Sequence, residues 1–266
     1  MNEKEPPDGA KALTLGLTIL RLLIQSEKAM TSTEIAQLVN VHQSTASRIL
    51  RALIAEGYVR KSNYRSFVPD LGVLAMGGKV IQHFPLIKKF IEPMQAIAQD
   101  INGLSVTLAT LWQGSLLYLI RCHQDQEPVL GYTIEFPLHL SSIGLKLCLD
   151  LPQNEAEKLL ENSKEKYGWS RPTQNVPTTL KKCLPEIRNF LIQDILVLKD
   201  YQKSDFINMA TDIGDFFDEN NHPMALAIFG SASLMEQDNV HLLLQKAKKL
   251  LQNAMYPSSP LNRNVS

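Results

Sequence analysis

The stretch "NVHQSTASRILRAL", residues 40–53, separates its side chains into two classes when it is placed at helical pitch. One side is apolar: Ala46, Ile49, Leu50 and Leu53. The opposite side has hydroxyls and arginines at spacings i, i+3, i+4 and i+7: Ser44, Ser47, Arg48 and Arg51. An ordinary surface helix mixes Glu and Lys on its outer side. The pattern therefore predicts a helix that packs by one side and has a basic, hydroxyl-rich side for another purpose.

The flanking segments predict the rest of a small domain. A helical pattern covers residues 11–25, and a second helix begins near Thr31 and Ser32, either of which can cap it. The third helix, the one described above, ends at Gly57. Two β-prone runs around residues 62–63 then predict a hairpin. Three helices and a hairpin in under seventy residues form the pattern of a winged helix-turn-helix.

This pattern predicts a DNA-binding domain. In a helix-turn-helix the second helix of the motif lies in the major groove, with its N-terminal residues at the base edges. Gln can pair with adenine, and hydroxyls and arginines can bond bases or phosphates. Residues 42–65 contain five Lys or Arg and one Glu, a local surplus of four positive charges in a chain of zero net charge. The residues expected to contact DNA are His42, Gln43, Ser44, Thr45, Ser47, Arg48, Arg51, Arg60, Lys61, Asn63, Tyr64 and Arg65.

The second half of the chain changes period and predicts an α/β domain. Pro69 and Gly77–Gly78 mark the boundary, followed by helical patterns over 71–84 and 86–101. Strand patterns cover 104–112, 115–122, 128–136, 195–201, 206–213 and 224–230. Helical patterns cover 141–151, 154–163, 178–193 and 233–254. We expect a mostly antiparallel sheet with helices, so the whole chain is predicted to be α+β.

Composition narrows the remaining classes of function. The three cysteines are far apart and the six histidines have no ligand spacing, so we expect no metal site, no disulfide framework and a reducing compartment. The chain contains neither a G-x-S-x-G nucleophile elbow nor a phosphate-binding loop, so we expect no enzyme and no cofactor. No apolar run approaches the roughly twenty residues of a membrane span, and the polar start "MNEKEPPDG" is unlike a signal peptide. We therefore expect a cytoplasmic protein without a membrane partner.

The sequence resembles the IclR-type bacterial transcription regulators. The likeness begins at "ALTLGLTILRLL" and continues through "TSTEIAQLVNVHQSTASRILRALIAEGYVRK", which has the family's order of elements. In the second half, "PLHLSSIGLKLCLDLP" resembles the family's Pro-Leu-x-Ala-Thr-Ala-x-Gly-Lys loop and helix, and "FINMATDIGD" and "HPMALAIFGSAS" resemble its last two strands. The likeness is specific in the first domain and looser in the second.

This resemblance implies a GAF-like α/β effector domain after the winged helix, in a dimer or a dimer of dimers. Small organic acids are the family's usual effectors, and they bind against the N-terminus of the helix that matches residues 142–151. By that match, the effector site would be formed by Ser142, Ile143, Gly144, Asp212, Ile228 and Phe229.

Two departures from the family pattern change what this site is expected to bind. The final strand reads "ALAIFG", so Ala227, Ile228 and Phe229 offer no hydroxyl where the family often has serines. Asp212, if buried, would repel an anion unless it were protonated or paired. One hypothesis is an altered pocket that takes a more apolar or a cationic ligand, or none. The other is a core filled by Phe229, with Asp212 on a loop edge.

The resulting prediction is a regulator that binds double-stranded operator DNA, itself and a small-molecule effector. Its expected parts are a flexible arm (1–10), a winged helix-turn-helix (11–72), a linker helix (73–84), an effector-binding and oligomerisation domain (85–255) and a disordered tail (256–266). The alternative is a metabolite-binding or enzymatic module whose N-terminal domain only dimerises, because a Ser/Arg helix face can also be merely solvated.

Overall fold

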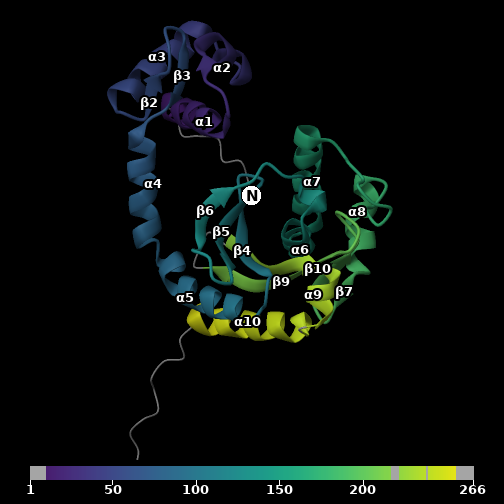
Figure 1. Cartoon of the computed structure of the whole chain (residues 1–266). Coiled ribbons are helices and arrows are strands. Elements are labelled where there is room, and N and C mark those ends of the chain that lie inside the picture. The colour runs from purple at the N-terminus through teal and green to yellow at the C-terminus, as the bar shows by residue number, and fades with distance from the viewer. Residues whose placement is uncertain (1–9, 217–221, 238, 256–266) are drawn as a thin grey trace, which may run out of the picture. The chain divides into compact units, whose positions relative to one another are not determined.

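The computed structural model describes residues 10–216, 222–237 and 239–255, and the chain divides into two compact units between Gln82 and His83 (Figure 1). The expected arm, apart from Ala10, and the expected tail lie outside the described residues. Each unit is described by itself.

The first unit contains the predicted three helices and hairpin. Its elements are α1 (Lys11–Gln25), β1 (Met30–Thr31), α2 (Ser32–Leu38), α3 (Gln43–Ala55), β2 (Val59–Lys61), β3 (Ser66–Pro69) and α4 (Leu71–His83). The strands form a small antiparallel sheet of order β1-β3-β2. Its core consists of Ile19, Leu23, Ile35, Ala36, Ala46, Leu50, Val59 and Phe67.

Capping groups fix the ends of α2 and α3. Thr31 is the N-cap of α2: its hydroxyl accepts the amide of Glu34 at 3.3 Å, and its own amide donates to the Glu34 carboxylate at 2.7 Å. This is the predicted capping box, with Thr31 rather than Ser32 as the cap. The turn to α3 contains Asn40 at φ 52°, and His42 then caps α3 by accepting the Ser44 amide at its Nδ1. These caps set the direction in which α3 leaves the turn.

The second unit is built on a seven-stranded sheet in which every paired strand is antiparallel. The strand order is β6-β5-β4-β10-β9-β8-β7. The strands are β4 (Ser105–Trp112), β5 (Ser115–His123), β6 (Val129–Thr133), β7 (Leu191–Ile192), β8 (Ile195–Lys199), β9 (Phe206–Phe216) and β10 (His222–Ser231). Neighbouring positions in this sheet therefore come from distant parts of the sequence.

Helices cover both faces of this sheet (Figure 1). One face packs against α5 (Pro85–Gln99) and α10 (Val240–Met255), and the other against α6 (Ser142–Asp150). The remaining helices are the 3-10 turn η1 (Leu138–Leu140), α7 (Gln153–Tyr167), α8 (Leu180–Arg188) and α9 (Ala232–Gln237). Helix α6 follows η1 directly and packs on β9 and β10.

Two predicted helices are wrong in extent. The helix expected over 178–193 ends at Arg188, because residues 191–192 pair with β8 as β7 across a turn at Gln193 and Asp194, whose φ values are both positive. The closing helix expected over 233–254 is two helices, α9 and α10, with Asn239 at φ 50° before the second. A left-handed residue cannot continue a helix, and helical period alone does not reveal such a break.

Candidate functional site

Helix α3 presents its basic side to solvent. Ala46 and Leu50 are buried in the core of the first unit, whereas Arg48 and Arg51 are exposed. The expected contact residues before Arg48 are also exposed or half-buried: His42, Gln43, Ser44, Thr45 and Ser47. The helix therefore has the accessible hydroxyl and guanidinium groups that a major-groove helix needs.

Two of these side chains already have partners. His42 is exposed, and its Nδ1 lies 2.7 Å from the Ser44 hydroxyl and accepts the Ser44 amide at 3.3 Å. Gln43 Nε2 donates to the Ser32 hydroxyl at 3.2 Å and so ties α3 to the start of α2. Both residues thus have a structural role that sequence analysis did not assign.

The β2–β3 hairpin holds the remaining expected DNA contacts. Asn63 Oδ1 accepts the amides of Arg65 and Ser66, both at 2.9 Å, and so closes the turn, which leaves only the amide NH₂ of Asn63 for another partner. At the same tip Tyr64 is 86% exposed, with the Arg65 guanidinium 5.7 Å from its ring centre. Lys61 is exposed, and Arg60 makes a long 3.9 Å contact with Asp70.

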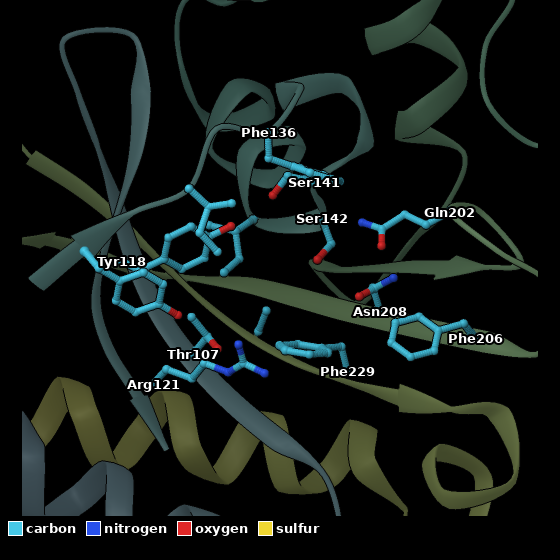
Figure 2. Close-up of a pocket in the computed structure, with 14 residues that line it drawn as sticks. Thr107, Tyr118, Arg121, Phe136, Ser141, Ser142, Gln202, Phe206, Asn208 and Phe229 are labelled. Atoms are coloured by element: carbon cyan, nitrogen blue, oxygen red, sulfur yellow. The ribbon is translucent and has the colours of Figure 1, made fainter. Parts of the chain in front are cut away.

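The second unit contains a cavity of about 210 Å³ between the sheet and the start of α6 (Figure 2). Aromatic rings form much of its wall, among them Tyr118 and Tyr132, which stack at 5.1 Å. The lining residues are Thr107, Tyr118, Arg121, Tyr132, Ile134, Phe136, Ser141, Ser142, Ile143, Gln202, Phe206, Asn208, Ala227 and Phe229. These residues belong to five strands, β4, β5, β6, β9 and β10, and to the start of α6 and two loops.

Several polar groups in the cavity wall have no partner in the described part of the chain. The Thr107 hydroxyl and the Asn208 amide nitrogen are buried without a hydrogen bond. Arg121 has no ion pair with a described carboxylate, and its guanidinium lies 5.3 Å from the centre of the Phe229 ring. Buried polar groups are normally paired, so unpaired ones in a cavity indicate a place for a bound molecule.

Burial also affects the ionisation of this wall. It raises the pKa of Tyr118, and Tyr132 adds to that increase, against smaller opposing contributions from Ser141 and Arg121. The Tyr118 phenol is therefore neutral near pH 7 and can both donate and accept.

Comparison with known proteins assigns the family. The family model of the IclR helix-turn-helix domain matches residues 12–62, which include α3 and its caps. The transcriptional repressor IclR of Escherichia coli (strain K12) is 23% identical over 244 residues, covering 86% of this chain and 83% of the repressor. The chain therefore contains an IclR helix-turn-helix domain and is similar over most of its length to an IclR repressor, which supports an IclR-type transcription regulator.

Solved structures of the same family share the fold. An IclR family regulator from Brucella abortus superposes with a TM-score of 0.75 at 21% identity, over 96% of this chain and 95% of that one. An IclR homologue from Microbacterium hydrocarbonoxydans, complexed with 4-hydroxybenzoate, has a TM-score of 0.62 at 18% identity, over 93% of this chain and 100% of that one.

The structure of this IclR-type regulator brings three of the six expected effector residues to the cavity. Ser142, Ile143 and Phe229 line it. The amides of Ser142 and Ile143 have no hydrogen bond to another described residue, as expected at a helix N-terminus. The amide of Gly144 differs, because it donates to the Ser141 hydroxyl at 3.1 Å. Gly144 instead permits close packing, since a Cβ there would lie 3.1 Å from Leu138.

Two residues expected in the pocket, Ile228 and Asp212, do not line the cavity. Side chains alternate along β10, so with Ala227 and Phe229 toward the cavity, the fully buried Ile228 points to the face covered by α5 and α10. Asp212 is four residues along β9 from Asn208, away from the cavity. Lys248 donates to it at 2.8 Å, and Lys146 lies at 3.6 Å. Asp212 is therefore a paired structural residue and does not repel an anion in the pocket.

Lys146 is the centre of that ionic cluster. Its side chain is 1% exposed and contacts Asp150 at 2.7 Å and Asp194 at 3.2 Å, besides Asp212. Burial opposes its charge, but the three carboxylates raise its pKa. Burial alone would raise the pKa of the Asp212 carboxyl. The hydrogen bond from Lys248 and the charges of the nearby lysines outweigh this effect, so the pKa of Asp212 is lowered. The cluster ties α6 to the sheet behind the cavity.

Arg121, Thr107 and Asn208 line the cavity but are not among the site residues predicted from the sequence. A signal was available: each is a polar residue inside an otherwise apolar strand pattern. What the pattern could not show is that these strands meet on one face of the sheet, because that depends on strand order.

Proposed function

We propose that this IclR-type regulator binds double-stranded operator DNA through α3 and the β2–β3 hairpin. The observation that supports this most is the solvent-exposed side of α3, where Arg48 and Arg51 follow a row of hydroxyls. In this assignment α3 enters the major groove and the hairpin tip, with Lys61 and Arg65, contacts the backbone. Residues 11–72 are the DNA-binding domain, 73–84 a linker and 85–255 the effector-binding and oligomerisation domain.

Titration into labelled DNA from upstream of its own gene tests this proposal. The protein should bind one fragment in preference to competitor DNA, and its affinity should fall steeply as salt rises, because bound lysines and arginines release counterions. Equal binding to all fragments, or none at any salt concentration, favours the alternative of a metabolite module whose N-terminal unit only oligomerises.

We propose in addition that the cavity of the second unit binds a small organic acid as effector, with no catalytic step. Within the described residues, the Thr107 hydroxyl and the Asn208 amide nitrogen have no hydrogen bond and Arg121 has no carboxylate partner, which supports a ligand that carries acceptors. The complex of the Microbacterium homologue with 4-hydroxybenzoate supports ligand binding in a protein of this fold. A thermal-shift panel of carboxylates tests it: at least one should raise the melting midpoint, and the shift should grow with the logarithm of its concentration above the dissociation constant.

We propose that the regulator works as a homodimer or a dimer of dimers in the cytoplasm. Helices α1 and α4 expose large apolar side chains at helical spacing, a pattern typical of a protein interface. They are Leu13, Leu17, Ile24, Leu71, Leu74, Met76 and Val80. None of the described helices combines the length and apolarity that a bilayer crossing requires. Sedimentation equilibrium of Leu17→Glu should show a weaker association than the wild type, with unchanged helix content by circular dichroism.

A further inference from the structure

Arg121 is the cation that faces the cavity without a described acidic partner. It lies on β5, half-buried, and its guanidinium is positioned by the ring of Phe229 at 5.3 Å from the ring centre. A partly desolvated guanidinium attracts an anion more strongly than one in bulk water, and its planar donors match a carboxylate. The other positive group at this cavity is the N-terminus of α6, equivalent to roughly half a charge.

Strand pairing places a second donor beside Arg121. Thr107 on β4 is the direct cross-strand partner of Arg121, and its buried hydroxyl has no hydrogen bond within the described structure. Directly opposite residues on one face of an antiparallel pair have their Cβ atoms about 5 Å apart. One carboxylate can therefore accept from the guanidinium and from the Thr107 hydroxyl together.

The opposite end of the cavity has its own polar group. Asn208 lies on β9, three strand spacings of about 4.8 Å from β5, and its amide nitrogen is buried without a partner. Figure 2 shows the Phe229 ring between Arg121 and Asn208. An aromatic ring therefore separates the two polar ends, and Phe136 and Tyr118 are further aromatic residues of the cavity wall.

The size of the cavity limits the ligand. An apolar cavity of about 150 Å³ accommodates benzene. The volume of about 210 Å³ here fits one ring with a carboxylate and leaves no room for a nucleotide. A two- or three-carbon oxo acid would leave much of the aromatic wall without contacts, at the cost of lost packing.

Resting on the proposed effector function, we propose that the effector is a single-ring aromatic carboxylate whose carboxylate is bound by Arg121 and Thr107, with its distal end toward Asn208. Arg121 is then the residue that determines specificity for charge, and the ligand's anion lies at the sheet rather than at the start of α6.

Calorimetric titration of the full-length protein with benzoate, benzamide and pyruvate tests this assignment. Benzamide has nearly the shape of benzoate without its charge. The wild type should bind benzoate at least tenfold more tightly than benzamide or pyruvate. Arg121→Gln should weaken benzoate at least tenfold and leave benzamide unchanged, and Thr107→Val should weaken benzoate about threefold. Arg121→Lys, which keeps the charge, should lose less than Arg121→Gln and guards against a folding defect.

Lys203→Gln is the matched control, because Lys203 lies 4.1 Å from the ring centre of the neighbouring Phe206 but does not line the cavity. It should bind benzoate within twofold of the wild type. Benzoate binding unchanged in Arg121→Gln, or equal binding of benzamide and benzoate by the wild type, overturns the proposal. Tighter binding of pyruvate overturns the aromatic class. A carboxylate that binds independently of Arg121 overturns this inference but leaves the effector function intact, whereas no binding by any carboxylate overturns both.

Discussion

The two units of this IclR-type regulator differ in where their functionally important positive charges lie: exposed in the first unit and buried in the second. In the first unit Arg48 and Arg51 lie exposed on α3. In the second unit Lys146 is enclosed by Asp150, Asp194 and Asp212. Exposed cations contribute little to folding and remain available to an external anion, whereas a buried cation needs its partners for the domain to stay folded. The location of the charge thus separates residues that bind from residues that support.

The largest expected effect concerns the buried cation. Lys146→Met should lower the free energy of unfolding by about 3 kcal/mol, because Asp150 then loses the lysine that pairs with it, while Asp194 and Asp212 keep Lys248. The exposure of Asp194 reduces this loss. Urea denaturation measures it. The control is Lys199→Met, whose partner Glu236 is also exposed and which should cost at most about 1 kcal/mol. Equal losses in the two variants would contradict the contrast between buried and exposed cations.

Removal of an exposed cation on α3 should cost a similar amount of DNA-binding free energy. Arg48→Ala should weaken operator binding by about 1–3 kcal/mol, roughly 5- to 150-fold, with an unchanged melting temperature. Electrophoretic mobility shifts at fixed salt measure the affinity. Lys28→Ala, an exposed cation of the same unit outside α3 and the hairpin, should bind like the wild type. If Arg48→Ala also binds like the wild type, α3 is not the recognition helix.

A smaller effect is expected at the capping box of α2, which supports the placement of α3. Thr31→Ala removes the hydroxyl that accepts the Glu34 amide and should cost about 1 kcal/mol of unfolding free energy. Thr31→Ser retains a hydroxyl and should recover most of that loss. Chemical denaturation of the two variants compares them, and a loss that serine does not recover would point to packing of the Thr31 methyl instead.

The smallest effect concerns pH and His139, whose ring stacks on Trp169 at 4.0 Å with Nε2 2.9 Å from the Ser170 carbonyl. Burial lowers the pKa of His139 below its usual 6.5, so the unfolded chain takes up a proton that the folded chain does not. Stability should therefore fall as pH drops below about 6.5. His139→Gln should flatten this decline in melting temperature between pH 7.5 and 5.5, and a slope equal to that of the wild type would exclude His139 as its source.

The first unit follows from the sequence because its determinants are local. The period of residues 40–53 and the caps of α2 and α3 involve residues a few positions apart. The cavity differs: Thr107, Arg121 and Asn208 meet only through the strand order β5-β4-β10-β9. Asp212 lies outside the cavity, and matching segments to a family pattern does not reveal that two lysines pair with it.

The most direct test of regulation measures both binding events on one protein. We expect the carboxylate that most raises the melting temperature to change operator affinity by about 5- to 150-fold at saturation. By linkage, saturating operator DNA should change the affinity for that carboxylate by the same factor. A carboxylate that binds the protein but leaves the operator dissociation constant unchanged would contradict the account, because the two units would then bind their ligands independently.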